Sequence, residues 1–203
     1  MKKALKIFFV LGICINFTAC QCVQPVTNYL PANFSEVVKD KVYRGGQPTN
    51  AQLENLKEKF QIKTVIKLNF EEEEAKGTNE KYEEEKAKDI SVRVVNAQTP
   101  PSTKSIKFYQ APDYANIQRA VNELEDKNNW PIYIHCSHGQ DRTGLVVALF
   151  RVMNTNKEIH MEINDAGDEM KEHGFHSYLF GLSEYWKQFK KLNGKTLPRP
   201  TTN

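Results

Sequence analysis

The feature that most constrains this chain is a short polar loop between two apolar segments. Residues 130–135 have the composition of a buried strand, and residues 145–152 are almost entirely apolar and suit a buried helix. The stretch from His135 to Gly144 joins them directly. We therefore predict a strand that turns tightly at Gly139 and passes into the N-terminus of a buried helix.

Strand and helix signals alternate over most of the chain. A capping box of Thr49 and Gln52 predicts the start of one helix, and the acid-rich residues 71–89 are interpreted as a solvated face with an exposed helix in its second half. The alternation predicts an α/β fold with a central, mostly parallel sheet of four to five strands flanked by helices, and a site at the carboxyl ends of the strands. The other expected elements are short strands within 33–44 around a turn at 39–40, strands at 64–68 and 92–95, a helix from 112–113, and helices at 158–173 and 178–192.

The loop carries residues suited to binding and attacking a phosphate group. Five residues separate Cys136 from Arg142, so a tight turn can point a ring of backbone N–H groups at one oxyanion while the guanidinium holds two of its oxygens. The helix dipole, the N–H groups and the guanidinium favour the thiolate of Cys136, and Thr143 can donate its hydroxyl to that sulfur. The candidate substrate-binding residues are Ser137, His138, Gly139 and Gln140.

The order His-Cys-x5-Arg-Thr-Gly between a buried strand and a buried helix resembles the signature of cysteine-dependent protein tyrosine phosphatases. Residues 43–48, Tyr-Arg-Gly-Gly-Gln-Pro, resemble a motif of small bacterial and plant or fungal dual-specificity members, and the likeness extends from Phe34 to about Leu192. The His-Gly-Gln-Asp-Arg-Thr-Gly loop looks closest to minimal bacterial phosphatases, some of which act on inositol phosphates.

This resemblance implies a PTP-like fold and a cysteine-dependent reaction. Cys136 would attack phosphorus to form a phosphocysteine, Arg142 would bind the transferred group, and water would release phosphate. The resemblance implies no metal or other cofactor. The histidines also match no common zinc-ligand spacing, so no metal site is predicted. These histidines are His135, His138, His160, His173 and His176.

The proton donor for the leaving group is the point at which the sequence departs from this family. Members usually carry an aspartate on a loop ~30 residues before the cysteine, but residues 97–112 contain no acid. Asp141, inside the loop, is the first candidate, because myotubularin-type lipid phosphatases carry an aspartate there in that role; its alternative role is an ion pair with Arg142 or a contact with nearby backbone. Asp113 is the second candidate, although its place before a helix is that of an N-cap. The third alternative is that neither residue donates the proton.

Three functions are compatible with these residues. The first is a phosphomonoester hydrolase that acts on phosphotyrosine and phosphoproteins or on inositol polyphosphates. The second is a catalytically silent phosphate-binding module. The third is a rhodanese-like thiol enzyme, against which the Arg142–Thr143 ending of the loop argues. Inositol polyphosphates would need further cations, for which the candidates are Arg44, Lys104, Lys107 and His138.

The N-terminus resembles a bacterial lipoprotein signal. A basic start precedes an apolar run over residues 7–17, which is too short to span a bilayer. The segment from Phe17 to Cys20 resembles a lipobox, so Cys20 is predicted to carry a lipid; the alternative is ordinary cleavage after Ala19. We expect an exported protein that is periplasmic or anchored to the outer membrane. Its expected parts are a signal over 1–19, a tether over 20–32, a phosphatase domain over 33–194 and a loose tail over 195–203.

Charge and cysteine content limit the partners and the redox chemistry. The first 19 residues hold three lysines and no acid, so the remainder has 25 basic and 25 acidic residues and gives no support for nucleic-acid binding. The expected partner is a phosphorylated small molecule or phosphoprotein, and the chain is expected to be a monomer. Cys14, Cys20 and Cys22 lie in or beside the signal, which leaves Cys136 as the single cysteine of the domain and excludes an internal disulfide.

Overall fold

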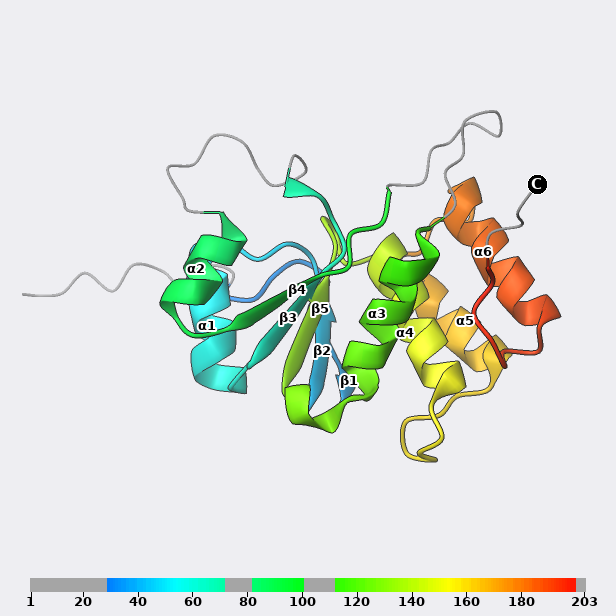
Figure 1. The fold of residues 1–203 in the computed structure, drawn as a ribbon, viewed down its shortest axis with the longest axis horizontal. Coiled ribbons are helices and arrows are strands. Elements are labelled where there is room, and N and C mark those ends of the chain that lie inside the picture. Colours follow the sequence, from blue (N-terminus) through cyan, green and yellow to red (C-terminus); the bar gives the residue numbers. More distant parts are fainter. Residues whose placement is uncertain (1–28, 72–81, 101–111, 200–203) are drawn as a thin grey trace, which may run out of the picture.

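A mostly parallel sheet of five strands forms the centre of the computed structural model, which describes residues 29–71, 82–100 and 112–199 (Figure 1). The strands are β1 (Ser35–Val38), β2 (Val42–Gly45), β3 (Thr64–Lys67), β4 (Arg93–Asn96) and β5 (Ile132–His135). Their order is β1-β2-β5-β3-β4, with β1 antiparallel to β2 and all other pairs parallel. The predicted α/β class and mostly parallel sheet are confirmed.

Helices cover both faces of this sheet (Figure 1). One face is covered by α1 (Asn50–Phe60) and α2 (Glu83–Asp89), and the other by α3 (Tyr114–Glu125), α4 (Asp141–Met153), α5 (Ile163–Glu172) and α6 (Phe180–Lys191). Residues 142–151 of α4 are all buried, because this helix lies between the sheet and the neighbouring helices. An almost wholly apolar helix therefore occupies the centre of the larger core.

Local signals in the sequence predicted several elements correctly. The capping box of Thr49 and Gln52 is present, with a hydrogen bond in each direction, and it precedes α1 as predicted. The helix expected from residues 112–113 is α3, which begins at Tyr114 and is capped by the side chain of Asp113. Its buried face includes Ile117, Val121 and Leu124.

Residues on both sides of the predicted domain of 33–194 also pack against it. Residues 29–32, expected within a tether, are held against the domain, since the carbonyls of Tyr29 and Ala32 accept hydrogen bonds from Asn55 Nδ2 (2.7 Å) and the Gly46 N–H (2.7 Å). The tail expected from residue 195 is not loose throughout, because Leu197 is only 7% exposed and belongs to the larger core. The predicted signal over 1–19 and Cys20 lie outside the described residues. No helix in the described ranges is long and apolar enough to cross a membrane.

Candidate active site

The predicted strand–loop–helix unit lies at the carboxyl edge of the parallel strands. β5 pairs with β2 on one side and with β3 on the other, and it ends at His135. Cys136 follows immediately and is 3% exposed, and α4 begins five residues later at Asp141. The loop is therefore surrounded by the ends of the neighbouring strands, which is where ligands bind in open α/β sheets.

Three successive carbonyl groups of the loop, at positions 137–139, accept hydrogen bonds from the surrounding chain. The donors are the Gln47 N–H (3.2 Å), Asn33 Nδ2 (2.8 Å) and Arg44 Nη2 (2.9 Å). In a trans peptide the C=O and the following N–H point in opposite directions. The N–H groups of residues 138–140 therefore face away from these donors, and together they can surround an oxyanion.

Close packing explains the glycine at the turn of the loop. Gly139 has a φ of +73°, and a Cβ at this position would overlap the backbone of Gly45 and Gly46. The neighbouring Gly46 is itself tight, because a Cβ there would lie 3.1 Å from the Ser137 carbonyl oxygen. The two glycines after Arg44 and the glycine of the loop thus allow two segments, far apart in the sequence, to meet backbone to backbone.

Arg142 is held in place by groups from three segments. Its Nη1 donates to the carbonyl oxygens of Leu68 (3.4 Å) and Thr99 (3.2 Å), and its Nη2 donates to Ser137 Oγ (3.1 Å). Leu68 follows β3 and Thr99 lies beyond β4, so the guanidinium is fixed at the sheet edge that carries Cys136. The residue is 6% exposed, and a planar guanidinium held in this orientation can donate hydrogen bonds to two oxygens of one phosphate.

Arg44 lies behind the loop and does not line a pocket for extra phosphates. It is 1% exposed and its Nη2 donates to the Gly139 carbonyl. Burial lowers the pKa of Arg44 to about 10, although the charges of Glu169 and Cys136 oppose the shift. The structure therefore gives Arg44 a role in supporting the loop, which corrects the expected role in polyphosphate binding. His138 is exposed, and the other expected cations, Lys104 and Lys107, lie outside the described residues.

A buried glutamate beneath the loop was missed by the sequence analysis, which assigned the acids of residues 71–89 to a solvated face. Glu83 Oε1 lies 3.0 Å from His135 Nε2, and both side chains are almost fully buried. Glu83 also accepts a hydrogen bond from Gln47 Nε2 at 2.9 Å. Burial by itself raises the pKa of Glu83, but the charge and hydrogen bond of His135, the bond from Gln47 and the charge of Lys67 outweigh it, and the pKa is lowered.

Replacement of Glu83 by alanine is expected to lower the free energy of unfolding by about 3–5 kcal/mol, because it leaves His135 buried without its partner. Since the folded state lowers the pKa of Glu83 below 4.5, the stabilisation is present above that pH and is lost as the pH falls through the folded-state pKa. Urea unfolding at several pH values measures both effects. Glu85→Ala, an exposed glutamate of the same helix, is the control and should change stability by no more than about 0.5 kcal/mol. Equal losses of unfolding free energy in Glu83→Ala and Glu85→Ala would show that the contact between Glu83 and His135 does not stabilise the fold.

Asp141 is hydrogen-bonded to His176, a residue of a distant segment that was not expected beside it. The His176 N–H donates to Asp141 Oδ1 at 2.7 Å, and the His176 ring nitrogen Nδ1 lies 3.1 and 3.2 Å from the two carboxylate oxygens. The connection between α5 and α6 therefore packs against the start of α4. Gly174, in the same connection, also packs closely against the Gln140 side chain of the loop. A Cβ on Gly174 would lie only 2.7 Å from Gln140 Nε2.

The remaining predicted residues have simpler surroundings. Asp113 Oδ1 accepts the Asn116 N–H at 2.8 Å, so this aspartate is the N-cap of α3, as its sequence position indicated. The Thr143 hydroxyl is buried and has no hydrogen-bond partner among the residues that the structure describes. The predicted donation of this hydroxyl to the sulfur of Cys136 is therefore absent from the structure, which corrects that expectation. Within the same ranges, no three His, Cys, Asp or Glu side chains gather as metal ligands.

Comparison with known proteins identifies one family and several relatives of similar sequence. A family model described as "Tyrosine phosphatase family" matches residues 29–165. The putative tyrosine-protein phosphatase OCA6 of Saccharomyces cerevisiae is 30% identical over 131 residues, which cover 62% of this chain and 58% of the relative. The inositol diphosphatase SIW14 of the same yeast is 27% identical over 122 residues, which cover 60% of this chain and 40% of the relative.

These alignments span about three fifths or less of the length of each relative. The fold is also shared with a solved structure, the core catalytic domain of the PP-IP phosphatase SIW14 from S. cerevisiae in complex with citrate. Its TM-score is 0.55 at 20% identity, over 84% of this chain and 98% of that domain. The likeness therefore includes nearly the whole of that catalytic core.

Proposed function

We propose that this chain, which belongs to the tyrosine phosphatase family, hydrolyses phosphate monoesters through a phosphocysteine formed on Cys136. The observation that carries the proposal is the loop geometry: its carbonyls at 137–139 are held outward, so its N–H groups and Arg142 converge on the space beside a nearly buried cysteine. Such a site stabilises the negative charge of a phosphoryl group during transfer.

The proposed reaction has two steps. In the first, the Cys136 thiolate attacks phosphorus, the S–P bond forms, and the P–O bond to the leaving group breaks as that oxygen takes a proton. In the second, water attacks phosphorus, gives up a proton, and the S–P bond breaks to release inorganic phosphate and the thiolate. Arg142 and the loop N–H groups hold the non-bridging oxygens in both steps.

Asp141 is our candidate for the group that gives and then takes back the proton. It lies at the first position of α4, next to Arg142, and its side chain is 21% exposed, so it keeps access to solvent. Its bonds to the His176 N–H and ring fix the carboxylate at the loop. Asp113 is engaged as the cap of α3 and has no comparable contact with the loop among those observed.

Asp141→Asn is expected to slow hydrolysis of an alkyl or inositol phosphate by about 10²–10⁴-fold and to slow an aryl phosphate far less, because an aryl leaving group departs readily as an anion. Asparagine keeps an oxygen that can accept the His176 N–H. Steady-state kinetics with a series of leaving groups measures the difference. A structural role would lower both rates together. Asp113→Asn is the control, and a leaving-group effect confined to it would reverse the assignment.

The proposed substrates are phosphotyrosine or phosphoproteins on one hand and inositol polyphosphates on the other. The names of the two yeast relatives support both classes, one being a putative tyrosine-protein phosphatase and the other an inositol diphosphatase. Hydrolysis of a phosphoester panel by the full chain tests activity and preference together. Phosphate release from at least one panel member is expected. Binding of these esters without any release would instead support the silent phosphate-binding module.

We further propose that the chain is exported and carries a lipid on Cys20, on the strength of the lipobox-like segment from Phe17 to Cys20. Growth of bacterial cells that express the full chain in labelled fatty acid is expected to label the protein. Cys20→Ala should remove the label, and Cys22→Ala, two residues away, should keep it. Label that persists in Cys20→Ala would overturn the assignment.

A further inference from the structure

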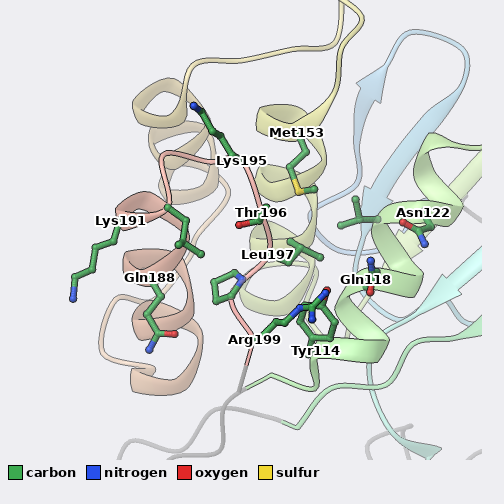
Figure 2. A pocket seen from close by; sticks show the side chains of 13 residues that line it. Tyr114, Gln118, Asn122, Met153, Gln188, Lys191, Lys195, Thr196, Leu197 and Arg199 are labelled. Atoms are coloured by element: carbon green, nitrogen blue, oxygen red, sulfur yellow. The ribbon is translucent and has the colours of Figure 1, made fainter. Parts of the chain in front are cut away.

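A groove of about 770 Å³ lies between α3, α6 and the segment 195–199 (Figure 2). No residue of the loop between Cys136 and Arg142 lines it. Its charged residues are all cations, Lys191, Lys195 and Arg199, and no aspartate or glutamate is among the described residues that line it. Its size is typical of ligand sites. This groove is separate from the site at Cys136 and is not used by the proposed reaction.

The positive charge of this region extends beyond the groove. Residues 185–199 contain five cations and no acid: Lys187, Lys190, Lys191, Lys195 and Arg199. The acid closest to them on α6, Glu184, lies 3.8 Å from Lys187 and is directed to that lysine, which does not line the groove. The residues that line the groove therefore carry three positive charges and no negative one, and a negatively charged ligand is favoured there.

The segment that forms one wall is fixed by packing. Leu197 and Pro198 are buried, and Leu197 belongs to the larger core. The Arg199 guanidinium lies over the ring of Tyr114, the first residue of α3, at 5.5 Å from the ring centroid. The middle of this segment thus contacts the core and its last residue contacts α3, so the groove has a defined shape before any ligand binds.

The polar residues of the groove suit a polypeptide backbone. Gln118 and Asn122 come from α3 on one side, and Gln188 comes from α6 on the other (Figure 2). A primary amide both donates and accepts hydrogen bonds, as the N–H and C=O of a peptide group require. The groove is also lined by the apolar side chains of Met153 and Leu197, which can pack against apolar side chains of a ligand.

From these features we propose that the groove binds an acidic, extended segment of a partner protein. The cations of the groove pair with carboxylates of this segment, and the side-chain amides hydrogen-bond to its backbone. Met153 and Leu197 pack against its apolar side chains. An inositol polyphosphate has no apolar part to pack against Met153 and Leu197, and it has no peptide groups to hydrogen-bond to the side-chain amides. A membrane surface is flat and does not enter a concave groove.

The test measures binding of a fluorescein-labelled peptide of alternating glutamate and leucine to the full chain by fluorescence anisotropy. The triple variant Lys191→Gln, Lys195→Gln, Arg199→Gln is expected to weaken binding by about tenfold or more, and added salt should weaken binding to the native chain. The matched control is Lys57→Gln, Lys63→Gln, Lys88→Gln, which removes three cations that do not line the groove and should bind as the native chain does. Thermal unfolding of both variants checks their folding.

A second measurement keeps the proposal testable if the triple variant does not fold. In ¹⁵N-labelled native chain, the acidic peptide should shift the side-chain amide resonances of Gln118, Asn122 and Gln188. A peptide of alternating lysine and leucine should leave them unchanged. Equal losses in the two triple variants, shifts confined to other residues, or a preference for phosphatidylglycerol vesicles or inositol hexakisphosphate over the peptide would overturn the proposal. None of these results depends on phosphatase activity.

Discussion

Replacement of Cys136 by serine is expected to lower turnover of every substrate by a factor on the order of 10⁴ or more, because the variant has no thiolate to attack phosphorus. Serine is close to cysteine in size, and the groups that we propose to bind phosphate belong to the loop backbone and to Arg142. Binding of a phosphate ester should therefore persist. The two measurements together separate the nucleophile from the binding site.

Turnover is measured as the release of inorganic phosphate. Binding is measured by calorimetry with a phosphate ester that the variant no longer hydrolyses. Cys22→Ser is the matched control, because it makes the same substitution outside the described domain and should leave turnover unchanged. Comparable turnover in Cys136→Ser and the native chain would mean that the reaction does not pass through this sulfur.

Arg142→Lys is expected to lower kcat/KM by about 10²–10³-fold even though the positive charge is kept. The guanidinium donates from Nη1 to the carbonyls of Leu68 and Thr99 and from Nη2 to Ser137 Oγ. A lysine has one nitrogen and cannot make these contacts while also presenting two donors to a phosphate. The loss should appear in binding as well as in transfer.

Arg93→Lys is the matched control, since Arg93 lies on β4 and forms an exposed pair with Glu123. Its kcat/KM should equal that of the native chain, and both variants should unfold at similar temperatures. If Arg142→Lys keeps native kcat/KM, the charge alone is sufficient and the two-oxygen fork is not required.

Local patterns made much of the fold predictable. The apolar runs on either side of the loop define β5 and α4, and the capping box of Thr49 and Gln52 fixes the start of α1. The loop itself was predictable for the same reason, because Cys136 and Arg142 lie within one short segment whose ends are set by those runs. Each of these signals is contained in a few neighbouring residues.

The contacts that were missed join segments far apart in the chain. Glu83 belongs to a run of acids, and nothing in that run distinguishes it from its exposed neighbours; its burial follows from the packing of α2 against the end of β5, where His135 lies. The contact of His176 with Asp141 depends on how the connection between α5 and α6 returns to α4. Leu197 likewise appears as part of a polar tail until the core that receives it is known.

The most direct test of the proposed function is to look for the covalent intermediate. The full chain is mixed with an aryl phosphate, quenched in acid within the first turnover, digested and analysed by mass spectrometry. We expect one phosphoryl group on the peptide that contains Cys136, formed in a burst whose amplitude matches the enzyme concentration, and absent from Cys136→Ser. Phosphate release at the same rate with no phosphorylated peptide, or with the group on His135 or His138, would contradict it.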